Sequence, residues 1–406
     1  NRGRWKRLFS VCFFRPERED IQQKGLTMTG REKIEAAFSP EGTDEIPAVI
    51  CYEGIFVRDH WEQLTEKHWW HQVVPDLERP MVCQREVIEK TGQDWFRLPG
   101  FYSREEREKL VVEERENGVF RVDLETGEAV LWPAPKIGGW GTGPHSVHPE
   151  RLVETEEEID ARIPEPSEAD PGMLKVDGRA DLAEKMLGEC GELYPLVHIA
   201  SPLWKCYHLW GFEGMMIMVA TRPDLVERVC QRSLAQSLVE VREAAVLGAA
   251  GVWIEECLTD MIGPDAFARL NVPFLTRLVD EIRAQGMHSI YYFCGDPLGK
   301  WEHLLAVGAD GLSLEESKKG FVIDIEEVVE RAQGKCAVLG NLDAVGVLQD
   351  GTEGELRAEV ERQMAAGRKN GNRFIMSIGS PVTPGTPVER VRLYCDLVHE
   401  LGGRGR

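Results

Sequence analysis

Long apolar runs are missing from this chain of 406 residues. No stretch of about 18 apolar residues is present, so we expect no membrane partner. The ten cysteines are scattered and include no CxxC pair, which predicts free thiols in a reducing compartment and hence a cytoplasmic protein. Basic charge is scarce, with 48 Lys and Arg against 69 Asp and Glu. A net charge of −21 repels phosphate backbones and makes nucleic acid a poor partner.

The first residues lack the features of a cleaved leader. The apolar run from Leu8 to Phe14 is short, and no Ala-x-Ala-like cleavage site follows it. We expect residues 1–27 to be disordered or a non-native leader, and residues 28–406 to form one barrel domain.

A Gly-rich dinucleotide loop is also absent, although strands and helices alternate in the second half of the chain. The alternation begins with an apolar run at 195–200 and a helical pattern at 223–247, and it ends with a run at 374–378 before a C-terminal helix. Strand and helix in alternation predict a parallel sheet with helices outside. The number of repeats favours an α/β fold of the (β/α)₈ TIM barrel type over a doubly wound sheet.

The N-terminal part carries weaker signals. Thr29 and Glu32 form a capping-box pattern for a helix at 29–38, and residues 46–52 resemble a strand. Residues 61–143 are aromatic-rich and irregular. Within them, Gly118–Asp123 and Ala129–Trp132 predict a β-hairpin. We interpret this stretch as an elaboration at one end of the barrel.

The carboxyl ends of the predicted barrel strands carry the candidate catalytic residues, because barrel enzymes place their chemistry there. Glu255 and Glu256 share one end, where one of the two should face the interior as a general acid or metal ligand; a salt-bridged loop carboxylate is the alternative. Cys294 suits a metal or substrate contact, unless it is an inert buried cysteine. His198 is placed to face the barrel mouth, with a satisfied core histidine as the alternative. We assign the acid role to Glu256 or Tyr292, with an ordinary half-buried strand tyrosine as the alternative for Tyr292.

Further polar residues are candidates for substrate binding. Asn341 and Asp343 can bind an amide, a hydroxyl or a metal-bound water, or Asp343 can cap the helix that follows. Arg58 and His60 could bind an anionic group, with a surface salt bridge as the alternative. Ser380 is the last candidate, and its alternative is a structural role.

Three short runs in this order and spacing resemble linked signatures of the uroporphyrinogen decarboxylase (URO-D) superfamily. These runs are Phe293-Cys294-Gly295-Asp296, Gly340-Asn341-Leu342-Asp343 and Thr386-Pro387-Val388-Glu389-Arg390. The resemblance is closer to the corrinoid methyltransferase branch than to the porphyrin decarboxylases. It implies methyl transfer between a small methoxylated or methylamine-type substrate and a corrinoid carried by a partner protein.

The resemblance also implies a zinc ion, held in that branch by a His-x-Cys strand end and a later cysteine, which binds a thiol as thiolate. The aligned positions here are Tyr292, Cys294 and Ser380, so only Cys294 retains a ligand type. A zinc site would therefore need oxygens from Glu255, Glu256 or Asp296 beside Cys294. Tyr292 would act as a proton donor in place of the histidine.

Two other functions stay open. Uroporphyrinogen III decarboxylation needs arginines for substrate carboxylates, and the Arg-Gln-Ala-Gly-Arg stretch of that branch is missing after residues 46–52, where Arg58 is the only nearby arginine. A ligand-binding barrel without catalysis is the remaining hypothesis.

Overall fold

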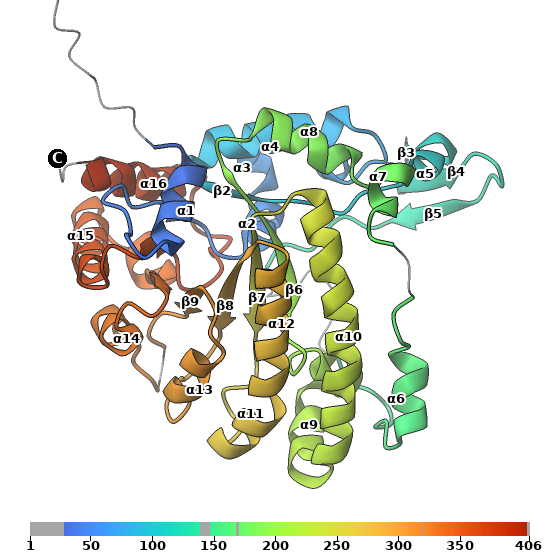
Figure 1. Ribbon diagram of the computed structural model, residues 1–406. Helices are drawn as coiled ribbons and strands as arrows, with labels where there is room; N and C mark the ends of the chain where they lie inside the picture. The colour runs from blue at the N-terminus through green and yellow to red at the C-terminus, as the bar shows by residue number, and fades with distance from the viewer. Residues whose placement is uncertain (1–27, 139–146, 168–169, 319, 404–406) are drawn as a thin grey trace, which may run out of the picture.

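The computed structural model describes residues 28–138, 147–167, 170–318 and 320–403, so the predicted leader at 1–27 lies outside the described residues. Eight strands, every recorded pairing parallel, form a nearly closed barrel in the order β1-β11-β10-β9-β8-β7-β6-β2 (Figure 1). The predicted (β/α)₈ barrel is confirmed. The barrel strands are β1 (Ala48–Val49), β2 (Trp95–Arg97), β6 (Tyr194–Ala200), β7 (Gly251–Glu256), β8 (His288–Phe293), β9 (Gly311–Leu314), β10 (Ala337–Leu339) and β11 (Phe374–Ser377).

Helices surround the strands and supply the outer layer (Figure 1). They are α1 (Gly30–Phe38), α2 (Glu53–Asp59), α3 (Trp61–Leu64), η1 (Trp69–Gln72), α4 (Glu78–Thr91), α5 (Arg104–Lys109), α6 (Glu156–Arg162), α7 (Met173–Asp177), α8 (Asp181–Glu189), α9 (Cys206–Thr221), α10 (Pro223–Leu247), α11 (Pro264–Leu270), α12 (Val272–Ala284), α13 (Trp301–Ala306), α14 (Ile325–Ala332), η2 (Ala344–Gln349), α15 (Glu353–Lys369) and α16 (Val388–Gly402).

Several predicted elements match the observed ones closely. Helix α1 has the predicted capping box between Thr29 and Glu32. The pattern at 223–247 is α10, whose Pro223 occupies the first turn, where a missing N–H costs nothing. The predicted strand at 46–52 is wrong in length: β1 is confined to Ala48–Val49, because Tyr52 turns into the left-handed region with φ 53°.

The aromatic elaboration is a separate antiparallel sheet of order β3-β4-β5, set off to one side in Figure 1. Its β4 (Gly118–Asp123) and β5 (Ala129–Trp132) form the predicted hairpin, and β3 (Leu110–Arg115) adds a strand that the sequence did not reveal. Two tryptophans attach this sheet to η1. Trp70 donates its indole N–H to Glu114 at 2.7 Å, and Trp69 packs edge-on against Trp132.

The barrel interior is filled by aromatic rings that fix which side chains point inward. Trp253 stacks on Tyr292 with ring centroids 5.0 Å apart and on His198 at 5.8 Å, and it meets Trp95 edge-on at 5.7 Å. Side chains alternate along a strand, so Glu255 shares the inward face of Trp253 and Glu256 takes the outward face.

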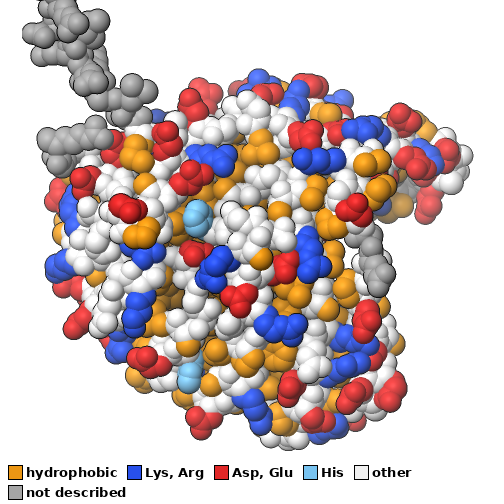
Figure 2. All heavy atoms as spheres, viewed as in Figure 1, with side chains coloured by type: hydrophobic (Ala, Val, Ile, Leu, Met, Phe, Trp, Pro, Cys, Tyr) orange, Lys and Arg blue, Asp and Glu red, His pale blue; other side chains and the backbone are white. Residues whose placement is uncertain are grey.

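The surface displays many of the charged side chains that the sequence contains. Figure 2 shows acidic and basic side chains intermingled with apolar ones over one face of the molecule. Among the described residues, no helix combines the length and the apolar character needed to cross a membrane.

Candidate active site

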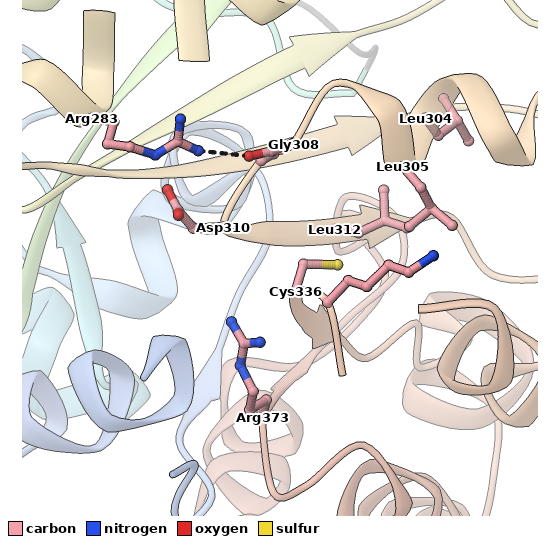
Figure 3. Close-up of a pocket in the computed structure, with 10 residues that line it drawn as sticks. Arg283, Leu304, Leu305, Gly308, Asp310, Leu312, Cys336 and Arg373 are labelled. Atoms are coloured by element: carbon pink, nitrogen blue, oxygen red, sulfur yellow. Dashed lines mark hydrogen bonds between the residues drawn. The ribbon is translucent and has the colours of Figure 1, made fainter. Parts of the chain in front are cut away.

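The direction of the strands identifies the end of the barrel at which an active site is expected. A cavity of about 180 Å³ is lined by Asp310, Cys336 and Arg373, which directly precede β9, β10 and β11. Figure 3 shows these side chains. That cavity therefore lies at the amino ends of the strands, the end that supports stability in barrel enzymes. The candidate active site is at the opposite end, where the predicted residues gather.

Glu255 is the central carboxyl of the barrel mouth. The Cys257 thiol donates to its Oε1 at 3.7 Å, and the Tyr52 hydroxyl, 3.3 Å from Cys257 Sγ, also contacts the carboxyl. Burial raises the pKa of Glu255, while the contacts with Tyr52 and Cys257 and the positive charge of Arg97 offset only part of that rise. Burial thus favours the protonated form of Glu255 more strongly than in a solvent-exposed glutamate.

Two thiols and a second carboxyl line the neighbouring wall. Cys294, half-buried at the end of β8, contacts Cys257, and that contact together with burial raises the pKa of Cys257 well above its usual range. Glu315 lies against Cys294 and accepts the Gly295 N–H at 3.0 Å; burial raises its pKa as well. This wall therefore places two cysteine side chains beside a carboxyl whose pKa is raised.

The opposite wall carries a histidine and an arginine. His198 points into the barrel, as the sequence predicted, and burial followed by the nearby charge of Arg97 lowers its pKa to about 3. The imidazole is therefore neutral at physiological pH. Arg97 was missed in the sequence because its strand, β2, was not recognised; its place two residues after the inward Trp95 is the signal that could have identified it.

Glu256, predicted as the catalytic acid, faces away from the mouth and that assignment is wrong. It is fully buried between the barrel and the helix layer, where Asn271 donates to its Oε2 at 2.7 Å and Tyr291 at 3.4 Å. Burial raises its pKa to about 7. The physical reason is strand alternation: Trp253 fills the barrel, so Glu256 must point outward.

The proposed metal set of Cys294, Glu255 and Glu256 is corrected for the same reason, since its two carboxyls lie on opposite faces of β7. Nor do the aligned family positions fit zinc, because the Tyr292 hydroxyl donates to the Gly379 carbonyl at 3.1 Å and the Ser380 hydroxyl donates to Glu316 at 2.6 Å. Among the described residues, no group of three or more His, Cys, Asp or Glu is arranged to hold a metal ion. We therefore derive no catalytic step from zinc.

Tyr292 and Ser380 have structural partners at the mouth. The hydrogen bond from Tyr292 to Gly379 joins β8 to the residues after β11. The Tyr292 hydroxyl therefore already donates its proton to a main-chain carbonyl. Ser380 accepts from the Lys318 ammonium at 2.7 Å while it donates to Glu316, and this holds the segment after β9 against that after β11.

The remaining substrate-binding candidates hold the surrounding loops. Arg58 clamps Asp59 with bonds of 2.6 and 2.9 Å, and His60 contacts the Phe56 carbonyl at 2.9 Å. Asn341 donates to the carbonyls of Glu315 and Ile323, and Asp343 caps η2. The contact of Asp343 matches the capping alternative that the sequence left open, whereas Arg58 and Asp59 form a buried ion pair and not the expected surface salt bridge.

A parallel barrel with a carboxyl of raised pKa, two cysteines and a neutral histidine at its mouth has the composition of an enzyme active site. Comparison with known proteins identifies the family. Residues 142–401 match the family model described as uroporphyrinogen decarboxylase (URO-D). The chain belongs to the URO-D family of enzymes.

Individual relatives are distant. A uroporphyrinogen decarboxylase of Anaeromyxobacter sp. (strain Fw109-5) is 26% identical over 268 residues, which are 63% of this chain and 71% of that protein. One of Solibacter usitatus is 27% identical over 156 residues, 38% of this chain and 42% of that protein. Among solved structures, a methyltransferase from Methanosarcina mazei superimposes with a TM-score of 0.63 at 16% identity, covering 92% of this chain and 99% of its own. This last likeness supports the fold.

Proposed function

We propose that this protein transfers a methyl group from a small methoxylated or methylamine-type molecule to a corrinoid carried by a partner protein. The observation that carries the proposal is Glu255, an inward-facing carboxyl with a raised pKa at the barrel mouth. Membership of the URO-D family and a fold shared with a methyltransferase support methyl transfer as the reaction class.

The residues of the mouth suit removal of a methyl group from oxygen. As the C–O bond breaks, the leaving oxygen gains negative charge, and a proton from Glu255 neutralises it and lowers the barrier. Tyr52 and Cys257 hold the carboxyl in place for that transfer. The rings of Trp253 and Tyr292, both buried, close the floor below and exclude water. A bound corrinoid supplies the acceptor for the methyl group.

Two adjacent glutamates provide a matched test. Methoxylated arenes and methylamines are incubated with the full-length protein and reduced cobalamin, and the demethylated product is quantified by mass spectrometry. We expect Glu255→Gln to lower the rate by about 10²–10⁴-fold, the usual contribution of a general acid. Glu256→Gln, which changes a buried carboxyl on the outer face of the same strand, should retain activity. Loss of activity in Glu256→Gln alone would refute the assignment.

Porphyrinogen decarboxylation is the second candidate, favoured by the names of the curated relatives. The same carboxyl could protonate a carbon atom that has lost carbon dioxide. Uroporphyrinogen III therefore belongs in the same assay, with release of carbon dioxide as the readout. Release that depends on Glu255, without any demethylation, would replace methyl transfer by decarboxylation; no product from either class would favour the ligand-binding barrel.

A further inference from the structure

The mouth contains an arginine whose place in the barrel is fixed by its strand. Arg97 is the last residue of β2 and lies beside Leu196 of β6, with the Leu98 N–H donating to the Leu196 carbonyl at 2.8 Å. It shares the inward face of Trp95, which packs on Trp253 inside the barrel. The side chain therefore leaves the strand above the aromatic floor, at the level where a substrate would lie.

The guanidinium of Arg97 has no recorded hydrogen bond or ion pair with any described residue, and the residue is exposed. A Cβ on Gly54 would lie 3.4 Å from Nη1 of Arg97, so the Arg97 guanidinium extends over the start of α2. By contrast, Arg58 of α2 forms two hydrogen bonds with Asp59. The planar donors of Arg97 thus remain available to a ligand.

The carboxyls near Arg97 are poor counter-ions for it. Glu53 is buried and already accepts hydrogen bonds from Gln93 and from the Arg97 main-chain N–H, and its burial raises its pKa to about 7. Burial raises the pKa of Glu255 too. His198, on the neighbouring strand, is neutral. A positive charge without a strong negative partner at the barrel mouth favours an anionic ligand.

We propose that Arg97 forms a carboxylate-binding subsite at the barrel mouth and selects substrates that carry a carboxylate apart from the group that reacts at Glu255. A guanidinium binds the two oxygens of a carboxylate with two parallel N–H donors, which fixes orientation as well as affinity. The neutral His198 imidazole adds a hydrogen-bonding group without a competing charge. The inference rests on the proposed function in one respect: the carboxylate belongs to the molecule that donates the methyl group.

Matched ligands test the subsite on the full-length protein. Calorimetric titration compares benzoate and 4-methoxybenzoate with 4-methoxybenzyl alcohol, which has the same ring without the negative charge. We expect the wild type to bind the acids roughly ten- to a hundredfold more tightly than the alcohol, as for a charge-assisted hydrogen bond. Arg97→Gln should lose this preference, and Arg97→Lys should retain part of it, because an ammonium attracts the charge without the paired geometry.

The control is Arg121→Gln, which removes an exposed arginine on β4 of the separate sheet and should keep the full preference for acids. Equal binding of acid and alcohol by the wild type, or an unchanged preference in Arg97→Gln, would refute the subsite. Tighter binding of 4-methoxyphenyl phosphate than of 4-methoxybenzoate would refute the choice of carboxylate. Should Arg97→Gln fail to fold, as judged by circular dichroism, the reduced preference of Arg97→Lys decides.

The inference and the proposed function can fail separately. Demethylation of the neutral alcohol at the same rate by wild type and Arg97→Gln, without a preference for acids, would refute the subsite and leave methyl transfer in place. A preference for acids that depends on Arg97, with no demethylation of any ligand, would support the subsite and refute the proposed function.

Discussion

Glu255 and Glu256 show that orientation, more than residue type, decides the role of a side chain. Both carboxyls end the same strand and burial raises the pKa of both, yet one faces the mouth and the other the helix layer. The sequence identified the pair and its alternation but could not assign the faces, because the direction of Trp253 depends on packing with rings from three other strands. The wrong choice of Glu256 follows from that missing information.

Because burial raises the pKa of Glu256, we expect the free energy of unfolding to depend on pH. Its pKa is about 7 in the folded protein, against about 4.3 in an unfolded chain. A raised folded-state pKa means that the protonated carboxyl stabilises the fold, so this contribution is complete below about pH 4 and is lost as the pH rises to about 7. The complete loss is roughly 4 kcal/mol, because each pKa unit corresponds to about 1.4 kcal/mol.

Glu256→Gln is neutral at every pH and should not lose this stability. In urea unfolding at pH 5 and pH 8, we expect the wild type to lose about 2–3 kcal/mol more than the variant. Glu53, whose pKa is also about 7, is present in both proteins and cancels in the comparison. The same difference in unfolding free energy at both pH values would contradict the prediction.

At the scale of elements, the length of a helix or strand determined whether the sequence could predict it. Helix α10 and strand β6 have long enough patterns for periodicity to define their ends, and the predicted 223–247 and 195–200 match them to within one residue. Strand β2 has only the residues Trp95–Arg97, too few to show alternation, so both the strand and its inward arginine were missed. Helix α9 was also missed; it bends at Gly211, where φ is 67°.

Two glycines of α15 make opposite predictions for the same substitution. A Cβ on Gly367 would lie 2.2 Å from Cγ of the buried Phe374 on β11, whereas a Cβ on Gly354 would meet nothing closer than Thr352 Oγ1 at 4.0 Å. We expect Gly367→Ala to destabilise the protein by about 1–3 kcal/mol through overpacking. Gly354→Ala should be neutral or slightly stabilising, because alanine favours helix. Thermal unfolding of both variants checks this; equal shifts would contradict the packing described here.

At the scale of the whole molecule, closure of the barrel depends on side chains, Asp94 among them, more than on a ladder of strands. The strand order begins at β1 and ends at β2, two short strands that lie on either side of the seam of the barrel. There, Asp94 donates its N–H to the Ala48 carbonyl at 2.8 Å, and its carboxylate accepts the Ala48 N–H at 2.7 Å. The same carboxylate contacts His399 of α16 at 2.7 Å and Lys33 of α1 at 3.3 Å, so it joins both termini of the domain to the seam.

Asp94→Ala should therefore destabilise the whole fold. Burial alone would raise the pKa of Asp94, but the bonds and charges of His399 and Lys33 and the Ala48 N–H lower it overall. Removing one partner from a buried ion pair costs about 3–5 kcal/mol. Asp343→Ala, which removes only the cap of η2, should cost about 0.5–2 kcal/mol and serves as the control.

The stabilisation of the fold by Asp94 should depend on pH. A lowered folded-state pKa means that the Asp94 carboxylate stabilises the fold above its unfolded value of about 3.9, and that this contribution disappears as the pH falls through the folded value. Urea unfolding should show the full difference between wild type and Asp94→Ala at pH 6 and a smaller one near pH 3. A difference that is constant with pH would mean that Asp94 acts by packing alone. The seam would then be held by its neighbours and not by its charge.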